Sequence, residues 1–248
     1  MKIIVLAAGM GERLMPLTKT TPKSLLDMGT GRTLLEEQLT RMEASGVITE
    51  CVLVVGYLAD QIEIALRACS TSTIKIRTIF NPFFSVSNNL ASLWLAKNEM
   101  SDDFLITNGD CIFPADVYLD FVGQSRSGIT LCVNKKKSYD DDDMKVMLSN
   151  DEIQKVSKQI AIADTVAESP GLSIVRGHAA RDHFVGHLES LLRQPEMLNR
   201  FWLEVFNSLI DEGQSVRPWI FPPGTKWQEV DFHLDLDTVR SVLFLGDI

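Results

Sequence analysis

The chain is 248 residues long and 45% hydrophobic, which is enough to bury a sizeable core as one large α/β domain. Its formal net charge of −9 argues against general nucleic-acid binding, because it would repel the phosphate backbone. No stretch reaches the roughly 20 apolar residues of a membrane span, and no cleavage site follows the first short apolar run. The four cysteines lack metal-site spacing, so we expect reduced thiols in a cytoplasmic protein without nucleic-acid or membrane partners.

The first half of the chain alternates strand and helix signals, which predicts βαβ units and a mostly parallel sheet. Strands are expected at 3–6, 51–55, 74–80 and 104–107. Helices are expected at 33–46, at 58–69, and from 87 to about 99. The first helix opens on a capping box formed by Thr33 and Glu36, and Ser87 is expected to cap the third.

The second half changes character, with more short strands and two amphipathic helices. Strands are expected at 128–133, 146–148, 153–156, 171–175, 216–221 and 227–230, and helices at about 179–193, 198–211 and 235–245. Asn150 and Asp151 mark a tight turn between two of these strands. The predicted fold is a single α/β domain over 1–248, Rossmann-like, with a mostly parallel mixed sheet flanked by helices and a smaller β-rich portion.

The first apolar strand is followed by a loop that is suited to hold a polyphosphate. Gly9 and Gly11 let backbone N–H groups approach a ligand closely, and Arg13 and Lys23 bring two cations to the same rim. The spacing is not a Walker A motif, which needs Gly-Lys-Ser/Thr after its second glycine, and it is not GxGxxG, because a third glycine is missing. A glycine turn alone would be unremarkable, but the added cations favour a nucleotide site.

The segment Leu6-Ala7-Ala8-Gly9-x-Gly11-x-Arg13, followed by Pro22-Lys23, resembles the signature of the nucleotidyltransferases that make sugar nucleotides and related CDP- or CMP-activated compounds. The resemblance implies the nucleotide-diphospho-sugar transferase type of fold, with a nucleotide-binding half at 1–110 and an acceptor-binding half at 111–248. It implies nucleotide contacts for Leu6, Ala7, Ala8, Gly9, Gly11 and Arg13. It also implies that Arg13 contacts the outer phosphates and that Lys23 lies by the α-phosphate and the acceptor, so both are expected to be catalytic.

Two aspartates are the expected metal ligands. Asp110 follows an apolar strand, at the edge where doubly wound sheets bind ligands, and Asp231 ends a second apolar segment. Each alone is also typical of a turn. The resemblance adds weight, because Gly109-Asp110 and Glu229-Val230-Asp231 match the family's Gly-Asp and Glu-Val-Asp motifs. It implies that both aspartates bind Mg²⁺ and that Gly109 contacts the nucleotide; Mg²⁺ prefers carboxylate, phosphate and water oxygens.

The expected reaction needs no nucleophilic side chain. An ionised oxygen of the acceptor attacks the α-phosphorus of the triphosphate in line and expels pyrophosphate, while Mg²⁺, Lys23 and Arg13 supply positioning and charge neutralisation. No general base is required, so none of the histidines is assigned a role. Those histidines are His178, His183, His187 and His233.

The stretch 81–93 indicates the nucleotide. Its Ser-x-Ser-Asn-Asn and Leu-x-Ser-Leu patterns resemble the branch that includes phosphocholine and phosphonate cytidylyltransferases, which implies CTP as substrate. Ser87, Asn88 and Asn89 are therefore counted with the nucleotide-binding residues, because an amide side chain can read a base edge with donor and acceptor together. Capping of the following helix is the alternative role for one of them.

The acceptor is expected to meet an acidic loop and two lysines. Lys145 or Lys158 would bind a phosphonate, and Asp142 or Asp143 an ammonium group, which together suit a zwitterion. Trp202 could add a cation–π wall, although it also fits the apolar face of a helix. The run 140–143 alone is typical of a solvated loop. The segments around Lys145 and Lys158 look more like 2-aminoethylphosphonate-type enzymes than like phosphocholine enzymes.

Alternatives remain open at this point. The leading hypothesis is a Mg²⁺-dependent cytidylyltransferase for a small phosphonate or phosphocholine-like acceptor, and the runner-up is a sugar- or polyol-1-phosphate nucleotidyltransferase. A catalytically silent regulatory module is disfavoured because Lys23, Asp110 and Asp231 are all present. A dinucleotide-binding oxidoreductase is disfavoured by the missing third glycine. The sequence leaves open whether the chain forms a homo-oligomer or belongs to a larger fusion.

Overall fold

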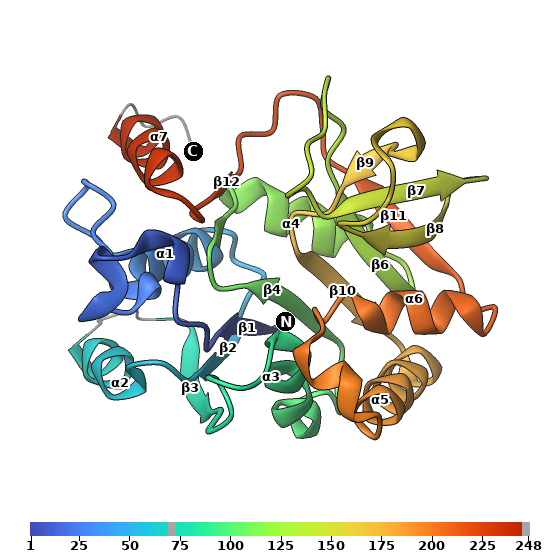
Figure 1. The fold of residues 1–248 in the computed structure, drawn as a ribbon, viewed down its shortest axis with the longest axis horizontal. Coiled ribbons are helices and arrows are strands. Elements are labelled where there is room, and N and C mark those ends of the chain that lie inside the picture. Colours follow the sequence, from blue (N-terminus) through green and yellow to red (C-terminus); the bar gives the residue numbers. More distant parts are fainter. Residues whose placement is uncertain (69–72, 245–248) are drawn as a thin grey trace.

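A seven-stranded sheet forms the centre of the computed structural model, which describes residues 1–68 and 73–244 (Figure 1). Its strands are β1 (Lys2–Ala7), β2 (Glu50–Val55), β3 (Lys75–Phe80), β4 (Phe104–Asn108), β6 (Gly128–Val133), β10 (Leu172–Arg176) and β11 (Val216–Ile220). The spatial order is β11-β6-β10-β4-β1-β2-β3. Neighbouring strands run parallel, except that β10 is antiparallel to both β4 and β6. The predicted mostly parallel mixed sheet is confirmed.

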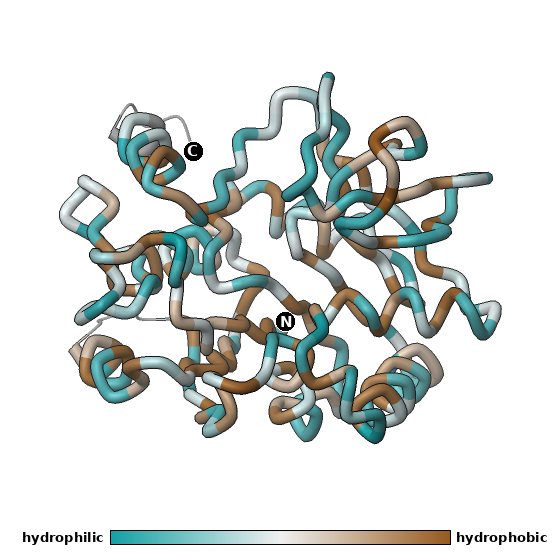
Figure 2. Tube along the Cα trace, viewed as in Figure 1, coloured by the Kyte–Doolittle hydropathy of each residue, from teal (hydrophilic) through white to brown (hydrophobic). Residues whose placement is uncertain are grey.

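Helices cover both faces of this sheet because its central strands are apolar on both sides. The helices are α1 (Leu34–Ala44), α2 (Ala59–Ala68), α3 (Asn89–Leu95), α4 (Ala115–Gln124), α5 (His178–Leu192), α6 (Glu204–Asp211) and α7 (His233–Phe244). In β1, Ile4 and Leu6 face a core shared with α3, α5 and α6, and Ile3 and Val5 face one shared with α1, α2 and α4. Figure 2 shows hydrophobic segments along these central strands.

Short 3₁₀ helices shape the connections: Glu12–Leu14, Leu17–Lys19, Lys23–Leu25, Lys97–Glu99, Ile162–Asp164 and Pro195–Asn199. Helix α7 packs on the segment after β1 through a small separate core that includes Leu14, Leu26 and Val239. This packing brings the C-terminal part of the described chain next to the N-terminal loop. None of the helices in the described residues is long and apolar enough to cross a membrane.

The smaller β-rich portion is also confirmed. Strands β7 (Lys145–Ser149), β8 (Glu152–Ser157) and β9 (Ala167–Glu168) form an antiparallel sheet in the order β8-β7-β9. Asn150 and Asp151 make the predicted turn between β7 and β8, with φ of 51° and 60°. A second small pairing joins β5 (Cys111–Ile112) to β12 (Gln228–Glu229).

Helix ends confirm one cap and correct another. The capping box at α1 is present, with Thr33 Oγ1 accepting from the backbone N–H of Glu36 and Glu36 accepting from that of Thr33. At α3 the cap is Asn88 and not Ser87, because Asn88 Oδ1 accepts from the N–H of Asn89 while Ser87 Oγ donates to the carbonyl of Phe83. The extended backbone of Asn88 places the N-cap one residue later than expected, and α3 begins at Asn89.

Several boundaries differ from the predictions because tertiary contacts set them. The expected helix 198–211 is a 3₁₀ turn followed by α6, and α7 begins at His233, two residues early. Asp235 stabilises that start by accepting from the N–H groups of Asp231 and Phe232. Helix α4 and the two-residue strands β5 and β9 were missed, since α4 lacks a side-chain N-cap and two residues carry no periodicity. The expected helix ends at Cys69 and Leu245 lie outside the described residues.

Candidate active site

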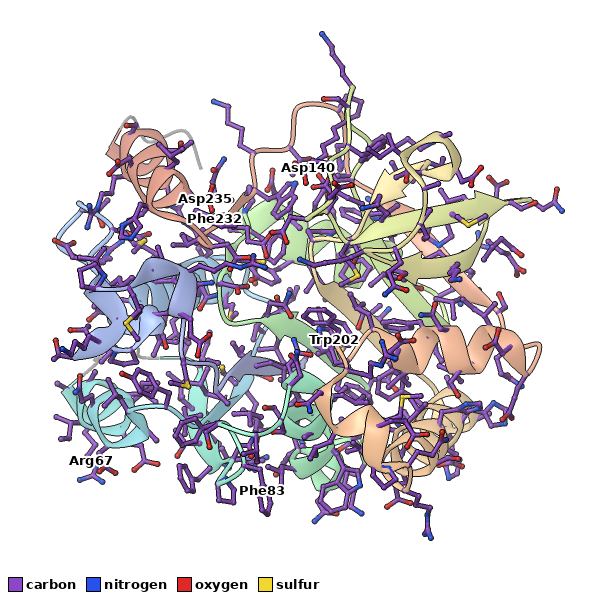
Figure 3. All side chains as sticks on the ribbon, in the orientation of Figure 1. Arg67, Phe83, Asp140, Trp202, Phe232 and Asp235 are labelled. Carbon is purple, nitrogen blue, oxygen red and sulfur yellow. The ribbon has the colours of Figure 1, made fainter. Side chains whose placement is uncertain are left out.

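A cleft of about 530 Å³ opens at the carboxyl ends of β1 and β4 and extends to the β7–β8–β9 sheet. Its walls include all but one of the residues singled out from the sequence. These are Leu6, Ala7, Ala8, Gly9, Gly11, Arg13, Lys23, Ser87, Asn88, Asn89, Gly109, Asp110, Asp142, Asp143, Lys158, Trp202 and Asp231. In Figure 3, Trp202 lies in the middle of the molecule, Phe232 and Asp235 lie at the start of α7, and Asp140 lies on the loop between β6 and β7.

The loop after β1 is shaped by close backbone contacts. The N–H of Gly109 donates to the carbonyl of Leu6 at 2.8 Å, and a Cβ at Gly109 would lie only 2.6 Å from that of Ala7. Gly11 has φ of 63°, a conformation that favours glycine. Gly9 differs, because a Cβ there would have no protein atom within 4 Å. Gly9 therefore leaves open space where the loop lines the cleft.

Lys23 lies at the centre of the charged groups. Its Nζ is 2.9 Å from Asp110 Oδ2 and 2.6 Å from Asp231 Oδ1, so one ammonium group contacts both aspartates. Burial alone would lower the pKa of Lys23, but the two carboxylates outweigh burial and hold that pKa above its usual range. The lysine is therefore a cation at neutral pH.

The pairing of β5 with β12 brings the two aspartates together. The N–H of Val230 donates to the carbonyl of Asp110 at 3.0 Å, which places the residue after Val230 beside Asp110. Asp235 then fixes Asp231 from the other side by accepting from its N–H at 2.9 Å. Two segments that are more than 100 residues apart thus present their carboxylates to one point.

Arg13 connects this centre to the opposite wall of the cleft. Its Nη1 is 3.2 Å from Asp231 Oδ2, and its two Nη atoms lie 2.9 and 3.1 Å from the carboxylate of Asp142. Lys158 Nζ contacts the same Asp142 at 2.7 Å. Burial would raise the pKa of Asp142, but Lys158 and Arg13 hold it below its usual range. Positive and negative groups therefore alternate from Asp110 across to Lys158.

The donor set suits a hard divalent cation. The carboxylates of Asp110 and Glu229 lie within 4.8 Å of each other, and Lys23 Nζ contacts both Asp110 and Asp231, so these three carboxylates surround one position for a cation. The thiol of Cys111 is equally close, but it is buried and a soft donor that does not suit Mg²⁺. Glu229 was not assigned from the sequence, although it lies in the quoted Glu-Val-Asp motif. Its pKa is raised to about 8, first by reduced hydration in the cleft and then by the charges of Asp110 and Asp231.

The amide-bearing segment before α3 forms another wall. Asn88 uses its Oδ1 as the helix cap, and Asn89 Oδ1 accepts from the backbone N–H of Trp202 at 2.8 Å. The carbonyl oxygens are thus used within the protein, while the Nδ2 donors of both residues make no hydrogen bond within the described part of the chain. Asn81 also lines the cleft, but it is buried and its Nδ2 donates to Ser92 Oγ.

The far end of the cleft carries a second group of charges. Lys136 Nζ lies 2.7 Å from Asp143 Oδ1 and 2.7 Å from Glu168 Oε2, and Asn134 Nδ2 donates to the other oxygen of Glu168. Burial raises the pKa of Glu168. Neither Glu168 nor the exposed aromatic Phe201, whose ring lies 5.7 Å from Lys158 Nζ, was singled out from the sequence. Isolated residues of these types give no sequence signal, because Glu168 reaches the cleft through the β7–β9 pairing and Phe201 through the segment before α6.

Two expected acceptor contacts are corrected. Lys145 is outside the cleft: it is 1% exposed, and its Nζ donates to the backbone carbonyls of Asp140 at 2.9 Å and Asp141 at 3.3 Å. Trp202 reaches the cleft wall, but its ring is fully buried against Phe206 and its Nε1 donates to Asn108 Oδ1. A fully buried ring offers no open face to a cation, so Trp202 supports the wall without forming a cation–π surface.

The mixed α/β sheet, with its ligand-facing loops at the carboxyl ends of parallel strands and a charged cleft there, defines a nucleotide-binding class of protein. A model of the family described as "Nucleotidyl transferase" matches residues 2–138, more than half of the chain. The chain belongs to this family, and the family prediction is confirmed.

Named relatives match a segment of the chain. The choline-phosphate cytidylyltransferase of Streptococcus pneumoniae is 34% identical over 113 residues, which is 46% of this chain and 46% of that protein. The CMP-5'-(3-aminopropyl)phosphonate synthase of Streptomyces rubellomurinus is 36% identical over 112 residues, 45% of this chain and 17% of that protein. The match thus spans about half of the first relative and under a fifth of the second. Both are in the branch that the sequence resembles.

Solved structures match over the whole fold. A CTP:phosphocholine cytidylyltransferase from Streptococcus pneumoniae superposes with a TM-score of 0.77 at 23% identity, covering 98% of both chains. An inositol-1-phosphate CTP transferase from T. maritima gives a TM-score of 0.79 at 22% identity, covering 99% of this chain and 96% of the other. At these identities the likeness establishes the fold.

Proposed function

We propose that this protein is a Mg²⁺-dependent cytidylyltransferase. It transfers CMP from CTP to the phosphonate or phosphate oxygen of a small acceptor and releases pyrophosphate. The preferred acceptor is a zwitterion such as 2-aminoethylphosphonate or another phosphonate, with phosphocholine as the nearest alternative. The named relatives support CTP as the donor, since one is a cytidylyltransferase and another forms a CMP-phosphonate.

One observation carries the proposal: Lys23 and Arg13 meet Asp110 and Asp231 in the cleft that the family's glycine loop also lines. Two cations at one rim suit a triphosphate, and two carboxylates beside them suit its metal. A structural ion-pair cluster would not require a cleft of about 530 Å³ next to it. We therefore assign triphosphate binding to Arg13 and catalysis to Lys23 with Arg13.

The reaction is an in-line displacement at phosphorus. A bond forms between the ionised acceptor oxygen and the α-phosphorus, and the bond from that phosphorus to the bridging oxygen breaks as pyrophosphate leaves. Lys23 stabilises the charge at the α-phosphate and orients the acceptor oxygen, and Arg13 neutralises the leaving phosphates. No proton needs to be removed, because the acceptor oxygen is already ionised at neutral pH.

Asp110 and Asp231 would hold the Mg²⁺, with Glu229 as a third carboxylate close by. When bound, Mg²⁺ supplies neutralisation of the triphosphate and a template for its orientation. The remaining contacts of the nucleotide come from the backbone of 6–11 and from Gly109. The Nδ2 donors of Asn88 and Asn89 are proposed to meet the O2 and N3 acceptors of cytosine.

The acceptor is proposed to bind in the second half of the cleft. Lys158 would contact the phosphonate, because it follows directly after β8, lines the cleft and lies across from Arg13. Asp143 and Glu168 would attract the acceptor's ammonium group, with the exposed ring of Phe201 next to Lys158. In this proposal 1–110 is the nucleotide-binding half and 111–248 the acceptor-binding half of one nucleotidyltransferase domain.

A second candidate is CMP transfer to a polyol or sugar 1-phosphate. It is favoured by the structural likeness to the inositol-1-phosphate CTP transferase, which covers 99% of this chain. The relatives also include an N-acetylmuramate alpha-1-phosphate uridylyltransferase from Neisseria meningitidis, 36% identical over 116 residues. The group that separates the candidates is the acceptor's cation, which only the zwitterions carry.

A pyrophosphate-release screen tests the proposal. Four nucleoside triphosphates are crossed with 2-aminoethylphosphonate, hydroxylated phosphonates, phosphocholine, inositol 1-phosphate and hexose 1-phosphates, with and without Mg²⁺. We expect release with CTP and an aminophosphonate or phosphocholine, and none without Mg²⁺. Turnover restricted to inositol or hexose 1-phosphate would favour the second candidate, and no release with any pair would refute transferase activity.

A further inference from the structure

Lys145 is a fully buried lysine that the proposed reaction does not use. Lys145 is the first residue of β7. It is 1% exposed, and its ammonium group lies under the acidic loop 140–143. Within residues 1–68 and 73–244 it has no carboxylate partner, and its two hydrogen bonds go to the carbonyls of Asp140 and Asp141. Lysines are rarely buried in this way because desolvation of the charge is costly. We therefore expect the role of Lys145 to involve the two carbonyl groups that it contacts.

The loop above Lys145 has a defined conformation. Asp140 Oδ1 accepts from the N–H groups of Asp142 and Asp143, at 2.9 and 3.1 Å, and Asp143 Oδ2 accepts from the N–H of Asp140 at 2.8 Å. These bonds satisfy the N–H groups on one side of the loop, and Lys145 satisfies the two carbonyls on the other. The loop is therefore held in one conformation from within the protein, although the side chains of Asp140 to Asp142 remain exposed.

Asp142 is the residue that this loop presents to the cleft. Its carboxylate bonds to both Nη atoms of Arg13, from the nucleotide-binding half, and to Lys158, from the acceptor-binding half. A single carboxylate therefore orients a cation proposed for the leaving phosphates and a cation proposed for the acceptor. Among the described residues the Asp142 side chain makes no other hydrogen bond, so its position depends on the backbone of the loop.

We propose that Lys145 is a positioning residue, which fixes the carbonyls of 140 and 141 so that Asp142 holds Arg13 and Lys158 in their productive orientations. This inference rests on the proposed function for the roles of Arg13 and Lys158. The placement of the loop itself does not depend on the reaction. A lysine suits this role because its long side chain crosses from β7 to the loop and its ammonium group can donate to two carbonyls.

The test removes the hydrogen-bond donors of the Lys145 side chain and keeps its length. Lys145→Met removes both hydrogen bonds at similar side-chain length, and Lys155→Met, at an exposed position on β8 of the same hairpin, is the matched control. We expect Lys145→Met to lower kcat/KM by about 10- to 100-fold, by analogy with the loss of a residue that orients a metal ligand. Lys155→Met should change it by less than about 2-fold.

A double-mutant cycle with Asp142→Asn separates positioning from general stability. If Lys145 acts through Asp142, Lys145→Met has little further effect in the Asp142→Asn background. Amide hydrogen exchange adds a readout that needs no activity: the N–H groups of Asp142 and Asp143 should exchange faster in Lys145→Met, while those of β1 and β4 are unchanged.

Equal losses in both backgrounds, or unchanged exchange of the loop amides, would overturn the proposal. If Lys145→Met does not fold, Lys145→Gln, which keeps an amide donor, takes its place in the cycle. Failure of both variants to fold would assign Lys145 to the stability of the hairpin and also overturn it. A wild-type protein without transferase activity would refute the proposed function, and the exchange experiment would still decide whether Lys145 orders the loop.

Discussion

Single residues at the centre of the cleft carry opposite charges in direct contact. Lys23 bonds to Asp110 and Asp231, and Arg13 shares Asp231 with it. In the proposed reaction the two aspartates hold Mg²⁺, so each of them has a role that an amide of the same shape cannot fill. Substituting each aspartate by asparagine tests its effect on the reaction rate separately from its effect on folding.

Asp110→Asn and Asp231→Asn should each lower kcat by roughly 100-fold or more, because each removes a negative ligand of the metal. Thermal unfolding should show an intact fold in both variants, since an amide keeps the shape of the side chain and one acceptor oxygen for Lys23. Asp237→Asn on α7, whose side chain is 74% exposed, is the control and should keep full activity. Near-normal rates in either of the first two variants would refute the metal assignment.

Alanine substitutions at two glycines of the cleft should have different effects, because an added Cβ would enter open space at one glycine and meet protein atoms at the other. At Gly9 an added Cβ meets no protein atom within 4 Å, so Gly9→Ala should change the free energy of unfolding by less than about 0.5 kcal/mol and raise the KM for CTP. At Gly109 a Cβ would lie 2.6 Å from that of Ala7, so Gly109→Ala should destabilise the fold by about 1–3 kcal/mol. Urea unfolding and CTP titrations measure both effects. An unchanged KM in Gly9→Ala would place the nucleotide elsewhere.

At the scale of elements, an ion-pair network connects β1, β2 and β3 on the side of the sheet where β1 and β2 begin, away from the cleft at the carboxyl ends of the strands. Glu99 bonds to the guanidinium of Arg77 on β3 and to Lys2 Nζ on β1, and Arg77 also contacts Glu50 on β2. The hydrogen bonds from Arg77, with further help from Lys2, lower the pKa of Glu99 to about 2. The network therefore stabilises the relative positions of three strands.

Glu99→Gln should cost about 1–2 kcal/mol of unfolding free energy at pH 7, less than the full pKa difference because the pairs are partly hydrated. The folded-state pKa lies below the ordinary value of 4.5, so this stability is present above pH 4.5 and is lost as pH falls towards 2. Urea unfolding at several pH values should show the variant and the wild type converging in that window. Glu189→Gln, in the more exposed pair with Lys97, should have no measurable effect.

At the scale of the whole molecule, the two proposed halves share one sheet. Strand β10, from the second half, lies between β4 and β6 and pairs with four residues of β4. The core on one face likewise contains side chains from both halves, such as Leu93 from α3 and Phe184 from α5. Strand β4 of the proposed nucleotide-binding half therefore depends on β10 of the proposed acceptor-binding half for its pairing on one side.

A fragment of residues 1–110 is accordingly expected not to reach the native fold. Without β10, the apolar strand β4 becomes an unprotected edge, and the face of the sheet that packs on α5 and α6 is exposed. Circular dichroism and two-dimensional NMR of the fragment, compared with the full chain, measure this. A cooperatively folded fragment with native chemical shifts in β1 and β2 would show that the halves are independent.

The local pattern of the chain predicted most of the fold. The strands at 3–6, 51–55 and 104–107 are continuous apolar runs, and their observed bounds differ from these by at most one residue at either end. Helix α1 was found from its capping box, which depends only on residues three apart. Helix α4 was missed because nothing of this kind marks its start, and β5 because its pairing partner is over 100 residues away.

The sequence by itself determined the chemical groups of the site, namely the glycine loop, its two cations and the aspartates at strand ends, because these follow from local order along the chain. Only the tertiary structure decided which groups meet. Lys23 and Asp231 are 208 positions apart and share a hydrogen bond, whereas Lys145 starts the very strand expected to supply an acceptor contact and faces inward. Side-chain direction depends on strand pairing and on the packing of distant segments, and residue type alone does not encode it.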